Sequence, residues 1–271
     1  MLKSLNREIK ICSTLKHCNI LQLHETFLEE KEKLYLIYEK ITGNDLFFEI
    51  EHKCSENYVF SESVICHYMK QLFDAIEYIH DRNIIHGDIR PHAIALASKN
   101  DDSILKITSF SCAMYENKEY ECIKEISQLV TQEWVYVEES RNGLIGMADY
   151  SPVIENEKIS KSLDMWLSGV FLYLMLCGKL PFLVKNSFTQ YLNLFLVESD
   201  NVDIKMDGKE WQPISKPAKD LCRRLMHPIS NNSFSIEQAI NHPWLNNKNL
   251  NCNLKESVYN IREFNKIRRL K

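Results

Sequence analysis

The sequence has no excess of positive charge. Its 271 residues include 33 Lys and Arg against 37 Asp and Glu, so the formal net charge is -4 at pH 7. Domains that bind nucleic acid usually concentrate basic residues on one face. The composition therefore argues against nucleic acid as a partner.

Paired cysteines and long apolar runs are also lacking. The nine cysteines are scattered, their number is odd and no two form a C-x-x-C pair, which fits a reducing cytoplasm. The longest apolar run, 165–177, is shorter than the roughly 20 residues of a membrane span. The N-terminus lacks the apolar segment of a signal peptide. We therefore expect a cytoplasmic chain without a transmembrane segment, in which 165–177 is a buried helix.

Apolar residues make up 45% of the chain, which suffices for a sizeable core. Their helical spacing predicts a helix over 2–16, and strand-like patterns predict strands over 20–27 and 33–38. A long helix is expected over 62–82. The remaining expected elements are a hairpin of 93–97 with 104–108 and helices over 161–177, 188–198, 216–226, 235–241 and after 254.

The strongest motif is the segment IIHGDIRPHA at 84–93. It resembles the catalytic loop of protein kinases, H-R-D-x-K-P-x-N. The resemblance implies that Asp88 accepts the proton of a substrate hydroxyl and that Arg90 neutralises the transferred phosphoryl group. The magnesium-holding asparagine is replaced by Ala93, whose methyl group offers no oxygen to a metal.

The second metal position of the family is also replaced. Ser109-Phe110-Ser111 stands where the resemblance places the D-F-G motif, so a neutral hydroxyl occupies the position of the chelating carboxylate. Gly87 replaces the arginine that pairs in many kinases with a phosphorylated loop residue. Ala93 and Ser109 are therefore degenerate metal positions, and we expect no bound metal and no use of magnesium.

Further segments with kinase-like motifs follow in the family's order along the chain: 5–9, 15–20, 34–39, 164–170, 177–182 and 241–245. They imply an α+β, protein-kinase-like fold, mostly the helical C-lobe with a reduced N-lobe of the αC helix and about two strands. We expect 1–40 to be the remnant N-lobe and hinge entry, and 41–245 the C-lobe with an enlarged activation segment at about 109–153. Residues 246–271 are expected to form a basic amphipathic tail helix.

The resemblance also assigns structural roles. Cys12, Leu23, His86 and Phe110 are expected to stack as the family's regulatory spine, and Asp164 to cap the backbone of the catalytic loop.

The resemblance to the kinase motifs also implies which residues stand at the family's nucleotide-binding positions. The adenine and ribose positions correspond to Glu39, Ile41, Asp45 and Ala95, and Glu8 corresponds to the αC glutamate. The sequence begins at the αC helix, so it holds neither a glycine-rich phosphate loop nor the lysine partner of Glu8. We expect that no cofactor is required, that ATP binds only weakly and without magnesium, and that the sequence is part of a longer protein.

Within the kinases, segments 66–71, 86–92, 96–99 and 261–271 resemble the calmodulin-kinase-like domain of the CASK type, found in MAGUK scaffold proteins. That family is described as pseudokinases, or atypical magnesium-independent kinases, that bind scaffold and junctional proteins. The resemblance implies protein partners of this kind. It also implies a cytoplasmic location at the inner face of the plasma membrane, reached through a larger scaffold.

The tail, 254–271, carries apolar residues at every third position with basic residues between them. A basic amphipathic helix is typical of calmodulin targets. The alternative is that the helix packs on the C-lobe with its charges in solvent.

Two functions are consistent with these observations. The first is a pseudokinase or scaffold module that binds proteins, and the second is an active serine/threonine kinase that uses Asp88 as base and Arg90 as the phosphate-facing cation without magnesium. Phosphotransfer measured with and without magnesium distinguishes them.

Overall fold

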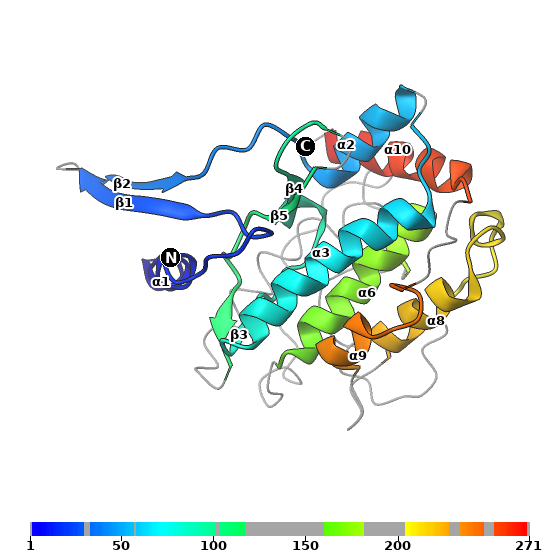
Figure 1. The fold of residues 1–271 in the computed structure, drawn as a ribbon. Coiled ribbons are helices and arrows are strands. Elements are labelled where there is room, and N and C mark those ends of the chain that lie inside the picture. The colour runs from blue at the N-terminus through cyan, green and yellow to red at the C-terminus, as the bar shows by residue number, and fades with distance from the viewer. Residues whose placement is uncertain are drawn as a thin grey trace, which may run out of the picture.

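The structure is a computed structural model that describes residues 2–29, 33–56, 58–100, 103–116, 160–181, 204–227, 234–246 and 252–269. Figure 1 shows a helical body, with one helix and a β-ribbon from the N-terminal part of the chain at its side. The expected helix over 188–198 and most of the expected activation segment, 117–153, lie outside the described residues.

The described helices are α1 (Leu2–Cys12), α2 (Leu46–Ser55), α3 (Glu62–His80), α6 (Ser162–Cys177), α8 (Lys216–Leu225), α9 (Ile236–Ile240) and α10 (Lys255–Arg269), with short 3-10 turns η1 (Pro91–Ala93) and η3 (Lys209–Trp211). The strands are β1 (Leu23–Glu29), β2 (Lys33–Tyr38), β3 (Ile84–Ile85), β4 (Ile94–Leu96), β5 (Leu105–Ile107) and β6 (Met114–Tyr115). They form three antiparallel pairs, β1 with β2, β3 with β6, and β4 with β5.

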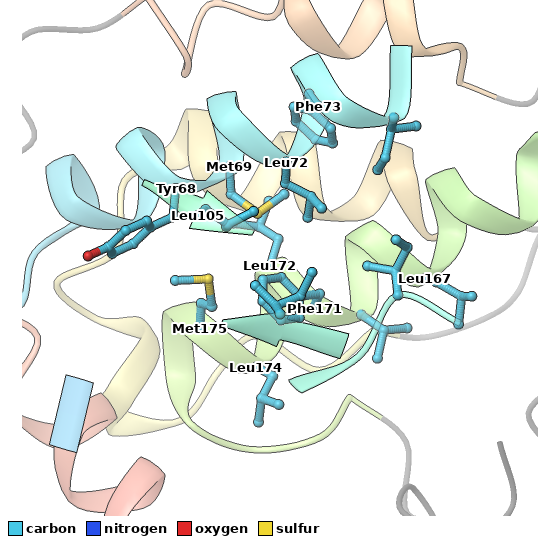
Figure 2. Packing of buried hydrophobic residues seen from close by; sticks show 14 of the residues in the cluster. Tyr68, Met69, Leu72, Phe73, Leu105, Leu167, Phe171, Leu172, Leu174 and Met175 are labelled. Carbon is cyan, nitrogen blue, oxygen red and sulfur yellow. The ribbon is translucent and has the colours of Figure 1, made fainter. Parts of the chain in front are cut away.

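Helix α6 is the centre of the core. Every residue from Leu163 to Cys177 is buried, as expected for the apolar run, and α6 contacts α3, α8 and α10. Figure 2 shows Met69 and Leu72 of α3 gathered with Phe171 and Leu172 of α6. A helix that is apolar all round can be stable in water only when other elements cover it on every side.

Helix α10 is held against the end of α6 by polar contacts. Ser257 Oγ donates to the carbonyl of Leu176, and Asn260 Nδ2 donates to the carbonyl of Cys177 at 2.8 Å. The last carbonyls of a helix have no partner within the helix, so α10 supplies donors that α6 lacks. Gly178 ends α6 in the left-handed conformation, with φ 73°.

The outer strands differ slightly from the expected ranges. The bounds of β2 coincide with the prediction, whereas β1 begins at Leu23 instead of residue 20. Ile20 forms a parallel bridge with Ile107 instead, and Leu21 N–H donates to the Ile107 carbonyl at 2.9 Å. The start of the predicted strand therefore joins the ribbon to the C-lobe.

The ribbon of β1 and β2 exposes large apolar side chains on both faces. Phe27 and Tyr35 stack with their ring centroids 4.8 Å apart, and both remain more than a third exposed, at 46% and 39%. Leu28, from the opposite face, is 70% exposed. An isolated two-stranded ribbon is marginally stable in water, so the ribbon depends on its base at the C-lobe.

The close contact of Gly178 with α10 predicts a stability effect. A Cβ at this position would lie 2.5 Å from Asn260 Cβ and 2.5 Å from the Ser257 carbonyl oxygen, on a backbone with positive φ. We expect Gly178→Ala to lower the free energy of unfolding by about 2–4 kcal/mol, measured by urea denaturation. Gly208→Ala is the matched control, because the three atoms nearest the added Cβ all belong to the flexible carboxylate end of Glu210. An equal effect of the two substitutions would contradict the role assigned to the α6–α10 contact.

Candidate functional site

A buried carboxylate fixes the loop that precedes η1. Asp164, on the first turn of α6, is fully buried. Its Oδ2 accepts from His86 N–H and its Oδ1 accepts from Gly87 N–H, both at 2.8 Å, and His80 Nε2 lies 2.8 Å from Oδ2. Burial alone would raise the pKa of Asp164, but the hydrogen bond and charge of His80 and the bonds to the loop hold the pKa below its ordinary value. The expected capping of the catalytic loop by Asp164 is present.

His86 links this loop to the segment at 109–111. Its Nε2 lies 2.7 Å from the Ser109 carbonyl oxygen and its Nδ1 accepts from Asp88 N–H at 3.1 Å, so the proton of a neutral ring is assigned to Nε2. The ring meets Phe110 edge to face, with centroids 5.0 Å apart. Cys12 and Leu23, the other two members of the expected stack, are both buried in the same core cluster.

Gly87 has a left-handed backbone, with φ 74°. Glycine adopts this conformation without the steric cost that a side chain with a Cβ incurs. The residue that replaces the family's arginine is therefore also the residue best suited to the backbone at this point.

Asp88 and Arg90 form a close ion pair inside the loop. Arg90 Nε lies 2.8 Å from Asp88 Oδ1 and 2.9 Å from Oδ2, and the Asp88 side chain is only 2% exposed. Burial raises the pKa of Asp88 to about 7, although the charge of Arg90 opposes the shift. The predicted base thus titrates near neutral pH with the predicted phosphate-facing cation as its direct partner.

The two degenerate metal positions do not fit a magnesium ion. Ala93 is 1% exposed and presents a methyl group, and the Ser109 hydroxyl lies 3.1 Å from the Ser111 hydroxyl. Magnesium is bound through oxygen ligands, usually including a carboxylate. Among the residues that the structure describes, no three His, Cys, Asp or Glu side chains are grouped so that they could hold a metal ion.

The side chain of Glu39 is engaged by the C-lobe. Lys106 Nζ donates to Glu39 Oε1 at 2.6 Å, and Gln22 N–H donates to the same oxygen at 2.8 Å. Burial would raise the pKa of Glu39, but Lys106 and the Gln22 N–H hold it below the ordinary value. Lys106 is the cross-strand partner of Ala95, another predicted nucleotide position. Lys106, which joins the hinge entry to β5, was not identified from the sequence.

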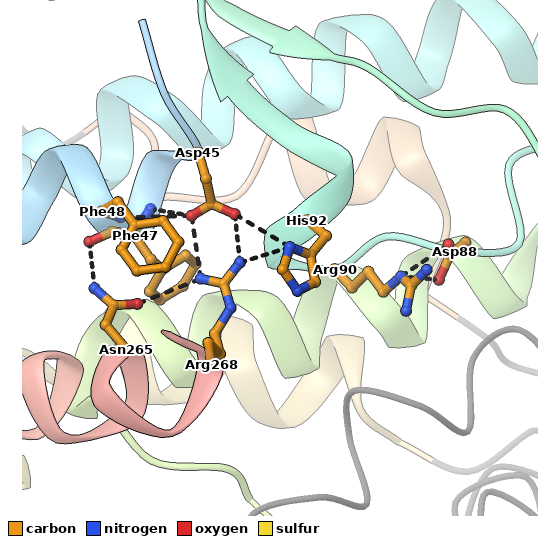
Figure 3. A network of polar contacts seen from close by, with 8 residues as sticks. All are labelled: Asp45, Phe47, Phe48, Asp88, Arg90, His92, Asn265 and Arg268. Carbon is orange, nitrogen blue, oxygen red and sulfur yellow. Dashed lines mark hydrogen bonds and ion pairs between the residues drawn. The ribbon is translucent and has the colours of Figure 1, made fainter. Parts of the chain in front are cut away.

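Asp45 is held by the C-terminal helix. It caps α2 by accepting from Phe47 N–H at 2.9 Å. Both of its oxygens face the guanidinium of Arg268, with the Nη1 to Oδ1 distance 3.1 Å. Arg268 Nη2 also lies 3.0 Å from His92 Nδ1 (Figure 3). Burial raises the pKa of Asp45, and Arg268 opposes the shift. The carboxylate at this predicted adenine or ribose position is therefore paired with a cation of the same chain.

Arg268 and His92 were not identified from the sequence. The available signal was the basic tail, which marked Arg268 only as one of several cations on a helix. Its partner in the site could not be inferred, because the residues in contact are 223 positions apart.

The last two predicted positions lie on the N-terminal side. Ile41 is half-buried between β2 and α2. The Glu8 carboxylate accepts a hydrogen bond from Phe110 N–H, while burial raises the pKa of Glu8. Arg7, its neighbour on α1, donates from Nε to the Ala113 carbonyl at 2.8 Å. Helix α1 is thus bonded to the segment that follows Ser109.

A family model and several known proteins match most of the chain. A family model described as "Protein kinase domain" matches residues 1–245, which leaves α10 beyond the match. Protein lin-2 of Caenorhabditis elegans is 32% identical over 275 residues, covering 99% of this chain and 26% of lin-2.

Two protein kinases have a similar sequence identity to this chain. Calcium-dependent protein kinase 3 of Plasmodium berghei (strain Anka) is 33% identical over 261 residues, covering 95% of this chain and 42% of that protein. Calcium/calmodulin-dependent protein kinase type 1 of Macrobrachium nipponense is 29% identical over 248 residues, covering 89% and 62%. The chain therefore spans between 26% and 62% of the length of these three relatives.

None of the helices in the described part of the chain combines the length and apolar character that crossing a membrane requires.

The raised pKa of Asp88 predicts a pH-dependent effect of Asp88→Asn. A carboxyl whose pKa in the folded state lies above the ordinary 3.8 loses folded-state stability as pH rises from about 4 to about 7. Asparagine stays neutral, so the stability of the variant relative to the parent should increase by about 2–3 kcal/mol between pH 5 and pH 8. Urea denaturation at the two pH values measures this difference.

The control for this experiment is Glu237→Gln, at an exposed carboxylate on α9. Its effect should be nearly the same at both pH values. A constant difference between Asp88→Asn and the parent would show that the Asp88 carboxyl is ionised in the fold at both pH values.

Proposed function

The chain belongs to the protein kinase family, and from this premise we propose that it acts as a kinase-fold module that binds partner proteins and transfers phosphate weakly or not at all. The α+β kinase-like fold and the resemblance to the CASK type, both expected from the sequence, are confirmed by the family match and by lin-2, the Caenorhabditis elegans homologue of CASK.

The observation that carries the proposal is that neither a carboxylate nor an amide oxygen stands at the two positions where the family holds its metal ions. Ala93 presents a methyl group, and Ser109 presents a neutral hydroxyl that faces Ser111. Phosphoryl transfer in this family depends on metal ions that neutralise the developing charge. Without them, a major source of transition-state stabilisation is lost.

The engagement of Asp45 supports the same proposal. A nucleotide ribose that reached Asp45 would have to replace the two contacts from Arg268. Breaking a partly buried ion pair leaves a desolvated charge that the new ligand must satisfy. We therefore infer that ATP binds weakly while α10 is docked.

Active phosphotransfer without magnesium is the second candidate. The observation that favours it is the Asp88–Arg90 pair at 2.8 Å, next to an assembled contact between His86 and Phe110. A base with a pKa of about 7 suits proton abstraction near neutral pH. On this reading Arg90 would have to leave Asp88 to meet a phosphate.

Protein partners are proposed from the relationship to lin-2. We infer that the module binds scaffold or junctional proteins in the cytoplasm, at the inner face of the plasma membrane through a larger assembly. The exposed apolar side chains of the β1–β2 ribbon, such as Phe27 and Leu28, are consistent with contacts to other polypeptide.

A phosphotransfer assay tests the main proposal. With a generic serine/threonine peptide and millimolar ATP, we expect no turnover that depends on Asp88, either with magnesium or with EDTA. We also expect ATP at 1 mM to raise the melting temperature by less than about 1 °C, because a ligand near or below its Kd contributes only a few tenths of a kcal/mol.

Asp88→Asn is the matched control for contaminating kinases. Turnover in EDTA that disappears in this variant would overturn the proposal and establish the second candidate. Turnover that persists in the variant belongs to a contaminant.

The docking of α10 against the C-lobe predicts that calmodulin has a lower affinity for the intact chain than for an isolated tail peptide. The apolar face of the helix, with Val258, Ile261 and Phe264, is buried against the C-lobe. A groove-binding partner needs that same face. We expect a peptide of residues 254–271 to bind calcium-loaded calmodulin at least about tenfold more tightly than the intact chain does, as measured by isothermal titration calorimetry. Equal affinities would mean that docking does not compete with calmodulin, and no binding by the peptide would remove calmodulin as a partner.

A further inference from the structure

We propose that His92 makes the docking of the last turn of α10 sensitive to protons: the neutral ring holds Arg268 in place, and the protonated ring releases it. The proposal goes beyond the binding function, because it concerns what controls access to Asp45.

The geometry places one guanidinium group between two acceptors. Arg268 Nη2 contacts both Asp45 Oδ2 and His92 Nδ1, the latter at 3.0 Å. His92 Nδ1 and Asp45 Oδ2 are themselves 3.9 Å apart. All three groups meet at one point, although they come from η1, the N-cap of α2 and the end of α10 (Figure 3).

The contact requires an unprotonated Nδ1. A guanidinium group can only donate, and a protonated imidazole has two donors and no acceptor. Imidazole side chains titrate near pH 6.5 in water. The His92 side chain is 46% exposed, so protons reach it while Arg268 remains docked.

The charges around His92 determine the direction of the effect. Asp45 faces it from α2 and Arg268 from α10, while Arg90, two positions earlier on its own loop, is paired with Asp88. Protonation would place a second cation, beside Arg268, next to the carboxylate of Asp45. The new N–H of His92 would also compete with Arg268 for Oδ2.

Arg268 has little capacity to adapt to this second cation. Its side chain is 6% exposed, and its Nε is buried without a hydrogen-bond acceptor among the described residues. Beyond its contacts with Asp45 and His92, its guanidinium lies 4.8 Å from the ring centroid of Phe48, and Nη1 lies 3.3 Å from Asn265 Oδ1. Loss of the contact with His92 therefore weakens a site that already leaves one polar atom unsatisfied.

Only the end of the helix is expected to open. Ser257 and Asn260 bind the carbonyls of Leu176 and Cys177 at the other end of α10, far along the helix from His92. Those neutral contacts do not titrate near pH 6.5. Since a proton binds the undocked state more tightly than the docked state, acidification favours undocking of residues 265–269.

Hydrogen–deuterium exchange of the full chain at pH 7.5 and pH 5.5 tests the proposal, with labelling times scaled for the intrinsic dependence of exchange on pH. We expect the protection of amides 265–269 to fall at least about fivefold at pH 5.5 in the parent, while that of the first turns of α10 changes little.

Two substitutions at His92 separate the titration from the contact. His92→Asn keeps an acceptor oxygen near the place of Nδ1 but cannot be protonated, so protection should stay high at both pH values. His92→Lys places a permanent cation there, so protection should be low at both. Asp45 is present in every variant, so a loss of protection at low pH that persists in His92→Asn would be assigned to Asp45 and not to His92.

His52→Asn is the matched control, because His52 is an exposed histidine on α2 and should leave the response to pH unchanged. The proposal is overturned if the parent shows no loss of protection, if His92→Asn loses as much as the parent, or if His92→Lys keeps full protection at pH 7.5.

Discussion

The carboxylate of Asp164 is the constraint on which the site depends. It is fully buried and binds His80, the N–H of His86 and the N–H of Gly87. An ionised group in such a place is tolerated only when several donors replace water. Because these bonds fix the backbone of the loop, the His86 ring is directed at Phe110 and at the Ser109 carbonyl. The loop and the 109–111 segment are thus held together by hydrogen bonds and ring contacts within the protein.

Each carboxylate placed at a ligand position by family resemblance, apart from that of Glu8, is paired with a cation of this chain. Asp88 meets Arg90, Asp45 meets Arg268 and Glu39 meets Lys106. Glu8 accepts instead from a backbone N–H. A ligand that used any of the three ion-paired carboxylates would first have to separate the pair, at a cost that grows with burial. The three carboxylates are therefore ion-paired within the chain, which favours the proposed binding module over a nucleotide site.

The elements that a local sequence pattern marks were predicted correctly. The apolar run at 165–177 could only be a buried helix, and the alternation in 33–38 gave the bounds of β2. The resemblance to the kinase family also implied that Asp164 caps the loop, as the structure has it. Helix α2 received no predicted range, although Asp45 stands at its N-cap. The partners Lys106 and Arg268 could not be predicted for a different reason, because each contacts a carboxylate far away in the sequence. Lys106 is 67 positions from Glu39, and Arg268 is 223 positions from Asp45.

The left-handed backbone at Gly87 has a consequence for how the sequence can change. An arginine that returned to this position would incur roughly 1–2 kcal/mol of backbone strain, and Asp164 prevents the loop from relaxing because it holds the N–H of Gly87 itself. Any side chain with a Cβ at this position would therefore carry that strain in the folded state, whereas glycine does not.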